Sequence, residues 1–323
     1  MRLLQKLLRK QTVAPGIVAI SFVGNGFTIA VTRYAEQNRP RLLHCEFVAA
    51  NAQQLAPQLE ILVKAYRLEE YDCHILLAPD QYRTMSIETP AVNTEEIKQA
   101  VAWRIAELLD YPIEQAAIDF YALPKSNRAN ATPMLEVFAV NRELSAALIQ
   151  SCKQVGLNIK VIDIQETALR NIATLMRENA QGIALLHLQK DCGRLIIQKR
   201  GSLYLSRKIV TGYLDLNENS SLSAVNSQDN EQDSLLALEI QRSFDYVENY
   251  FDIPPITSLA TVLMPINTQA IINFLNFNHG ITARAMDLSA TVEGDILLDD
   301  ATQNLCAPVI GASLRRWLET VST

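Results

Sequence analysis

The chain has 323 residues, of which 49% are hydrophobic and 20% are charged, and its formal net charge is -6 at pH 7. This composition is typical of a soluble globular protein with enough apolar material for two domains. The acidic balance argues against a nucleic-acid-binding protein, which usually carries a basic face, so we expect no nucleic-acid partner.

The spacing of cysteine and histidine residues indicates neither a disulfide framework nor a metal site. The five cysteines are scattered, odd in number and never spaced as CxxC. The four histidines lie far apart, without the spacing of metal ligands. We therefore predict free thiols in a reducing compartment and no bound metal.

The first residues read MRLLQKLLRK, with leucines on one helical face and Arg2, Lys6, Arg9 and Lys10 around the rest. No stretch approaches the ~20 apolar residues that span a bilayer, and we expect no signal peptide. A short basic amphipathic helix over residues 1–15 is suited to an anionic membrane surface. A frayed terminus, or a helix docked on its own domain, fits this segment equally well.

Residues 16–79 predict the start of a first domain. Two apolar, β-branched runs joined by Gly24-Asn25-Gly26 form a strong hairpin signal. A third strand, a helix and a further strand follow, over residues 41–50, 53–66 and 73–79. This order predicts a mixed sheet with a crossover helix.

Residues 80–160 read as strand, helix, strand, strand, helix, strand, which is typical of a compact split-βαβ unit. Within it, Thr94 is the predicted N-cap of a helix over residues 97–109. Trp103 on that helix is predicted to be a core or partly core residue. We predict that this unit is inserted into the first domain, which resumes over residues 161–180.

Residues 181–323 predict a second domain that repeats the opening of the first. Three short strands follow Gly182, with turns at 190–193 and 201–202, which points to an internal duplication. The polar segment 217–233 is predicted to be a mobile loop. The predicted helix over 165–178 belongs to the resumed first domain. In the second domain we predict helices over 234–251, 268–278 and 307–320, and strands over 258–264 and 280–286. The last of these helices has a proline near its start and contains Trp317.

This order of elements resembles the actin-like ATPases with an inserted subdomain, as in FtsA and PilM. The stretch AWRIAELLDYPIEQAAIDFYALP resembles the PilM-like segment in which a helix leads through a (Y/F)P(I/L)EEA turn into a strand. LEIQRSFDYVENYF resembles the second-domain helix of these proteins, and APVIGASLRRW resembles their C-terminal helix. The likeness covers nearly the whole chain. The cytoplasmic domain of the secretion protein GspL is a related possibility.

The resemblance implies an α/β, actin-like fold, a duplicated ribonuclease H-like pair of domains with an inserted split-βαβ subdomain. It also implies a cytoplasmic scaffold, peripheral at the inner membrane, for type IV pilus assembly. In that role the protein binds the cytosolic tail of a PilN-like bitopic membrane protein and other pilus assembly proteins. In the family the tail groove lies between the first domain and its inserted subdomain, and it captures an extended or short helical segment.

The nucleotide motifs of the family are altered at three places in this chain. Val18 or Ala19 stands where the first hairpin carries an Asp, and His187 stands at the Asp of the second hairpin. Pro265 follows the strand that should lead into the glycines of the adenosine motif. We therefore expect no ATP hydrolysis, because phosphate approach needs glycine and Mg²⁺ needs carboxylates.

Weak ATP binding without hydrolysis, with or without Mg²⁺, stays open. The candidate residues for such a cleft are Ser21, Asn25, Gln189, Lys190, Gly193 and Gly311, although hairpin turns and close helix packing explain them as well. An ATP-binding switch that gates the same assembly is therefore the alternative function. A sugar or metabolite kinase of the same superfamily is a third hypothesis, and the missing phosphate loops weigh against it.

Overall fold

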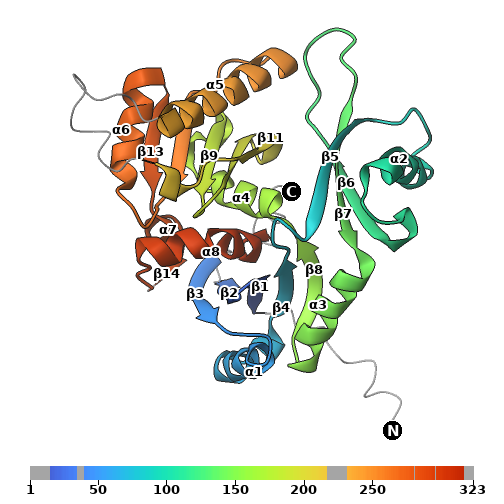
Figure 1. Cartoon of the computed structure of the whole chain (residues 1–323), viewed down its shortest axis with the longest axis vertical. Helices are drawn as coiled ribbons and strands as arrows, with labels where there is room; N and C mark the ends of the chain where they lie inside the picture. The colour runs from blue at the N-terminus through green and yellow to red at the C-terminus, as the bar shows by residue number, and fades with distance from the viewer. Residues whose placement is uncertain (1–14, 35–39, 217–230, 280, 295, 316–323) are drawn as a thin grey trace.

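The fold comes from a computed structural model that describes residues 15–34, 40–216, 231–279, 281–294 and 296–315 (Figure 1). Two sheets lie in the lower and upper parts of the view in Figure 1, and a smaller third sheet lies to the right of the upper one. The predicted amphipathic segment lies outside the described residues, apart from residue 15.

The first sheet has six strands in the order β14-β3-β2-β1-β4-β8. β1 and β2 form the predicted hairpin, and β4 and β8 continue the sheet in parallel. β1 is apolar along most of its length because helices cover both faces of the sheet. The strands are β1 (Gly16–Val23), β2 (Gly26–Tyr34), β3 (Pro40–Ala49), β4 (Asp72–Leu76), β8 (Asn158–Asp163) and β14 (Glu293–Gly294).

The second sheet has five strands in the order β11-β10-β9-β12-β13. Its pairings repeat those of the first sheet, with an antiparallel three-stranded opening followed by two parallel strands. This repeat confirms the predicted internal duplication. The strands are β9 (Ile183–Leu188), β10 (Gly193–Lys199), β11 (Ser202–Ile209), β12 (Ser258–Val262) and β13 (Thr282–Met286).

Helices cover the outer faces of the two sheets. α1 (Leu55–Tyr66) and α3 (Arg142–Gln154) pack on the first sheet, and α5 (Glu231–Phe251) and α6 (Thr268–His279) pack on the second. A short helix α7 precedes β14, and the described part of the chain also contains five 3-10 turns. These elements are α7 (Leu288–Thr291) and the turns Leu68–Glu70, Ala106–Leu108, Ile113–Gln115, Arg177–Ala180 and Tyr213–Asp215.

Two further helices cross between the sheets. α4 (Gln165–Thr174) and α8 (Asp300–Ser313) pack against one another and share a core with both sheets. A Cβ added to Gly311 would lie 2.1 Å from the carbonyl oxygen of Ala168, so the helices touch backbone to backbone at this point.

The inserted unit contains β5 (Tyr82–Glu88), α2 (Ile97–Ile105), β6 (Ala116–Ala122) and β7 (Met134–Asn141). Its three-stranded sheet has the order β5-β7-β6, and α2 packs on one face of it. We expected β8 to complete this unit. It pairs instead with β4 in the first sheet, because its apolar positions pack with α3 over that sheet.

Several predicted details of the helices are wrong. Glu96, not Thr94, occupies the N-cap of α2, because residues 94–96 form a turn that precedes the helix. Trp103 is 72% exposed, because the buried face of α2 carries Val101 and Ile105 instead. Trp317 lies outside the described residues.

The bounds of three predicted helices also change. α8 begins at Asp300, where the carboxylate of Asp299 accepts the N–H of Thr302, so Pro308 lies inside the helix. α4 ends at Thr174, and a 3-10 turn follows it. α5 already includes residues 231–233, which we predicted as loop, and residues 217–230 lie outside the description.

Within the described residues, no helix is both long enough and apolar enough to cross a membrane.

Candidate functional site

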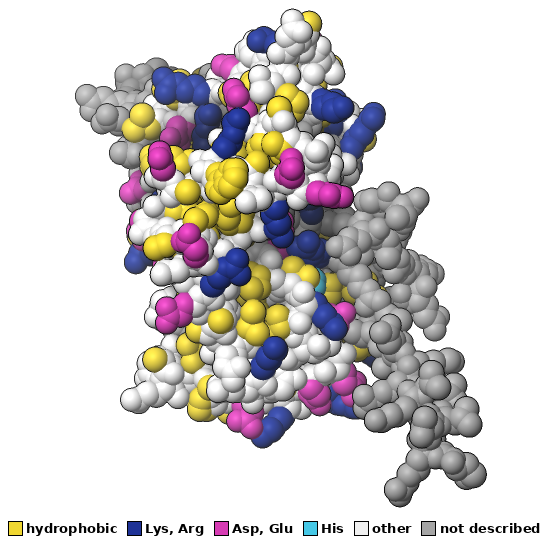
Figure 2. Space-filling model, turned by 90° about the vertical axis from the view of Figure 1, so that its right-hand side faces the viewer, with side chains coloured by type: hydrophobic (Ala, Val, Ile, Leu, Met, Phe, Trp, Pro, Cys, Tyr) yellow, Lys and Arg dark blue, Asp and Glu magenta, His cyan; other side chains and the backbone are white. Residues whose placement is uncertain are grey.

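A groove of about 230 Å³ lies between the inserted unit and the first domain. The face of the molecule that carries the inserted unit and α3 is shown in Figure 2, where hydrophobic side chains gather both above and below the middle. The groove is lined by Leu77, Tyr82, Ala117, Ile118, Asp119, Phe138, Ala139, Val140, Ser145, Ile162 and Ile164.

The walls of the groove come from three parts of the chain. β6 and β7 supply one wall, and the ends of β4 and β8 supply the opposite wall, with Ser145 of α3 between them. Leu77, Tyr82 and Phe138 form a small buried cluster at this junction. The groove is therefore mainly apolar, and it is formed only when the inserted unit meets the first domain.

A buried polar chain connects the groove with the second domain. The hydroxyl of Tyr82 donates to Oε2 of Glu166 at 2.6 Å, and Nη1 of Arg194 lies 2.6 Å from Oε1 of the same carboxylate. Tyr82 is on β5, Glu166 on α4 and Arg194 on β10. Burial, followed by the charge of Glu166, raises the pKa of Tyr82, so the phenol keeps its proton and donates.

The loop between β6 and β7 makes a second contact with the second domain. The N–H of Asn127 donates to Phe251 O at 3.0 Å, and its side-chain amide donates to Asp252 O at 2.9 Å. The hydroxyl of Ser126 donates to Tyr250 O at 2.7 Å. The inserted unit thereby satisfies carbonyl groups at the C-terminal end of α5, which have no partner within the helix.

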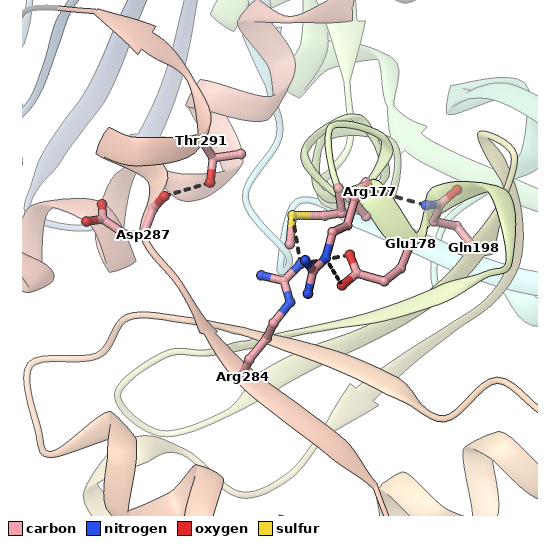
Figure 3. A network of polar contacts seen from close by, with 8 residues as sticks. Arg177, Glu178, Gln198, Arg284, Asp287 and Thr291 are labelled. Carbon is pink, nitrogen blue, oxygen red and sulfur yellow. Dashed lines mark hydrogen bonds and ion pairs between the residues drawn. The ribbon is translucent and has the colours of Figure 1, made fainter.

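The junction between α4 and β9 is held by a third network (Figure 3). Arg284 of β13 donates to Glu178 at 2.9 Å, and Arg177 reaches the other oxygen of the same carboxylate at 3.0 Å. Partial burial acts to raise the pKa of Glu178, but the hydrogen bonds from Arg284 and Arg177 outweigh it, and the pKa lies below its ordinary value. The ionised Glu178, bonded to Arg284 and Arg177, therefore holds the chain in place where it enters the second sheet.

The structure distributes the predicted nucleotide-cleft residues over three separate places. Ser21 is buried on β1 opposite Thr28, and Asn25 is in the turn between β1 and β2, where its carbonyl accepts the N–H of Ala50. Gln189 and Lys190 lie in the turn between β9 and β10, and Gly193 is the first residue of β10. Gly311 lies on α8 against α4. Within the described residues, no hydrogen bond links the first turn to the second.

The turn between β9 and β10 is covered by the segment around Gly212. Tyr213 N–H donates to Gln189 O at 2.8 Å, and Leu214 N–H donates to Lys190 O at 3.2 Å. The N–H of Gln189 is itself bonded to Cys192 O at 2.7 Å. A Cβ on Gly212 would lie 2.2 Å from Lys190 O, which shows how closely the two segments pack.

The positions where the family carries metal-binding carboxylates are buried and offer no carboxylate oxygen. Val18 lies in the core under α1 and α3, and Ala19 lies in the core shared with α4 and α8. His187 is 1% exposed, and its Nε2 lies 2.8 Å from Asn304 O. Burial lowers the pKa of His187 to about 4, so the imidazole is neutral and donates through Nε2.

The segment after β12 is built from non-glycine residues. Ile266 packs on the core of the second domain, and Thr268 accepts the N–H of Met264 at 2.9 Å through its hydroxyl oxygen.

Among the residues that the structure describes, no group of three His, Cys, Asp or Glu side chains is arranged to hold a metal ion. The membrane-surface candidates Arg2, Lys6, Arg9 and Lys10 fall outside that set.

No family model and no curated protein matches the chain. Among solved structures, the PilM-PilN type IV pilus biogenesis complex is similar with a TM-score of 0.66 at 14% identity, over 95% of this chain and 99% of that one. The duplicated sheet order and the two crossing helices agree with this likeness.

The chain has an actin-like ATPase fold.

Two further solved structures are similar at lower TM-scores. A Bacteroides thetaiotaomicron protein with actin-like ATPase fold gives 0.45 at 12% identity, over 94% of this chain and 98% of that one. The cytoplasmic domain of EpsL, an inner membrane component of the type II secretion system of Vibrio cholerae, gives 0.44 at 12% identity, over 90% and 93%.

The groove residues were not identified by sequence reasoning. β6 carries Ala117 and Asp119 toward the groove, and they alternate with Ile118 and Phe120, which face α2. That alternation shows a sheet with two covered faces, but nothing in it tells which face meets the first domain.

Proposed function

We propose that this chain is a scaffold of a type IV pilus assembly machine and binds the cytosolic tail of a PilN-like inner-membrane protein in the groove. The observation that carries this proposal is the apolar groove at the junction of the inserted unit with the first domain. The similar structure of a PilM-PilN complex supports the choice of partner. An apolar groove captures a short segment by burying its apolar side chains.

We further propose that the pilus is of the mannose-sensitive haemagglutinin (MSHA) type, because the sequence resembles the PilM-like protein MshI. In this proposal the protein lies in the cytoplasm at the inner membrane. The basic residues Arg2, Lys6, Arg9 and Lys10 add affinity for anionic lipids. Other pilus assembly proteins bind elsewhere on its surface.

We propose that ATP hydrolysis is not part of this function. Val18, Ala19 and His187 supply no carboxylate, and the turn at Gln189 already uses its amide within the protein. Hydrolysis needs metal ligands and free amides together at the phosphates.

The alternative is an ATP-binding switch that gates the same assembly. One observation favours it: Arg194, which follows Gly193 directly, pairs with the carboxylate that also binds the groove residue Tyr82. A ligand near the turn between β9 and β10 would therefore be linked to the groove through two contacts. These are the ion pair of Arg194 with Glu166 and the hydrogen bond from Tyr82 to Glu166.

Isothermal titration calorimetry tests both functions on one sample, first with Mg-ATP and then with a peptide of the PilN-like cytosolic tail. The scaffold predicts heat from the peptide alone, and the switch predicts heat from Mg-ATP as well. Ala117→Arg places a charge in the groove and is expected to weaken peptide binding by about tenfold or more. Ala122→Arg, at an exposed position of the same strand, is the matched control and keeps the affinity. Equal affinity for both variants would place the tail elsewhere.

A further inference from the structure

The helix α2 of the inserted unit has a second, exposed face. Val101 and Ile105 bury one side of the helix on the three-stranded sheet, and the indole of Trp103 on the opposite side is 72% exposed. The residues of that side follow the spacing i, i+3, i+4, i+7 that is typical of a helix face which packs on another element. We call it the Trp103 face, and it consists of Glu96, Gln99, Ala100, Trp103, Ala106 and Glu107.

The Trp103 face is separate from the groove. Leu135 and Val137 of β7 pack with α2, whereas Phe138 and Val140 of the same strand line the groove. Successive side chains of a strand point to opposite faces of the sheet, so α2 covers the face opposite to the groove. In Figure 1, α2 lies on the outer side of the inserted unit. A partner on the Trp103 face therefore does not compete with a ligand in the groove.

The indole of Trp103 is not used inside the described part of the molecule. It makes no hydrogen bond and no stacking contact with another described residue. Ala100 and Ala106, on either side of it, are small and half-buried, so they leave space beside the indole for the side chains of a second helix. Tryptophan is among the residues that dominate the binding energy between proteins when they become buried.

The border of the Trp103 face is acidic. Glu96 and Glu107 lie on the same side of the helix as the indole, and neither forms an ion pair with a described residue. The two cations of α2 point elsewhere. Nη1 of Arg104 donates to a carbonyl oxygen of β5 at 3.3 Å, and Lys98 lies about 140° around the helix from Trp103. This border disfavours an anionic lipid surface and attracts Lys or Arg side chains, which also bind over the face of an indole.

We propose that the Trp103 face binds a basic amphipathic helix of a partner protein. The partner helix packs its apolar side chains on Trp103 and on the alanines beside it, and its Lys or Arg residues pair with Glu96 and Glu107. A helix face offers no free main-chain groups for strand pairing, so the partner is recognised through side chains. The chain thereby has a second docking surface, which a partner can occupy while the groove is filled.

The fluorescence of Trp103 tests this proposal on the full-length chain. The chain contains two tryptophans, so Trp317→Phe leaves Trp103 as the one indole reporter. The probe is an amphipathic peptide of Leu and Lys of about 18 residues, long enough to form a helix, and the control peptide carries Glu in place of Lys. We expect the Lys peptide to shift the emission of Trp103 to shorter wavelength, because the indole leaves water, and the Glu peptide to cause no shift.

Variants measured with a labelled Lys peptide test the two kinds of contact separately. Trp103→Ala should weaken binding by about tenfold, and Glu107→Lys by about fivefold. Ile61→Ala removes an exposed apolar side chain from α1, and Glu69→Lys makes the same charge change on the first domain. Both are matched controls and should keep the affinity, as should Ala117→Arg in the groove. Thermal unfolding checks that each variant is folded.

Four results would overturn the proposal. Equal binding of the Lys and Glu peptides would remove the role of charge, and equal affinity of wild type and Trp103→Ala would remove the role of the indole. An emission shift with phosphatidylglycerol vesicles but not with the Lys peptide would assign the Trp103 face to the membrane. A shift that depends on the protein concentration alone would assign it to a second copy of this chain.

Discussion

At the scale of single residues, a histidine of the second sheet replaces a hydrogen bond that a proline removes from α8. Pro308 has no N–H, so the carbonyl of Asn304, four residues earlier, loses its helical partner. Nε2 of His187 lies 2.8 Å from that carbonyl oxygen and donates to it. The side-chain amide of Asn304 in turn donates to Leu188 O at 3.0 Å. His187, which stands where the resemblance implies a metal-binding Asp, thus replaces the hydrogen bond that Pro308 removes from the helix.

The pH dependence of stability tests this role of His187. The pKa is 6.5 in the unfolded chain and about 4 in the folded protein, so the unfolded state binds more protons in between. The free energy of unfolding therefore falls as the pH drops from 6.5 toward 4, by about 3 kcal/mol in total.

His187→Gln keeps an N–H donor but does not titrate. The free energy of unfolding of this variant should therefore not show the decrease that protonation of His187 causes. Urea unfolding of both proteins at pH 7 and at pH 4.5 measures the difference. Identical pH profiles would show that His187 is already charged in the fold or that its burial is incomplete.

At the scale of elements, α5 takes its C-terminal cap from another part of the molecule. The carbonyls of Tyr250, Phe251 and Asp252 accept hydrogen bonds from Ser126 and Asn127 of the loop between β6 and β7. Local sequence rules place helix caps within a few residues of the helix end. Here the cap lies more than a hundred positions earlier, so the inserted unit helps to define where α5 stops.

We predict that Asn127→Ala loosens the last turn of α5 and leaves the rest of the fold unchanged. The lost side-chain bond to Asp252 O should cost about 1 kcal/mol. Hydrogen exchange of the amides over residues 247–251 should become faster, while exchange in β9 should not change. Arg128→Ala, an exposed neighbour in the same loop, is the control. Equal protection in wild type and Asn127→Ala would show that Ser126 and the main-chain bond suffice.

At the scale of the whole molecule, three separate parts meet at one buried carboxylate. Glu166 is 1% exposed and joins Tyr82 of the inserted unit to Arg194 of the second domain. Removing one partner of a buried ion pair leaves the other charge without compensation.

Glu166→Gln should therefore lower the free energy of unfolding by about 3 kcal/mol, measured by urea unfolding. It should also weaken tail binding, because Tyr82 lines the groove. The exposed ion pair of Arg83 with Asp110 is the control, and Asp110→Asn should leave the unfolding midpoint unchanged. Loss of stability without any change in tail affinity would show that the network is structural only.

The sequence by itself determined the duplicated α/β architecture, the hairpin at Gly24-Asn25-Gly26 and the order of nearly all elements. These follow from local periodicity, turn residues and apolar runs, which act over a few positions. Tertiary structure alone decided that β8 joins the first sheet, that Trp103 faces outward, and that Pro308 lies inside a helix. It also decided the groove, because Leu77, Ala117 and Ile162 meet only when the inserted unit packs on the first domain. These contacts depend on which face of the three-stranded sheet packs on the first domain. The alternation of side chains along a strand does not indicate that face.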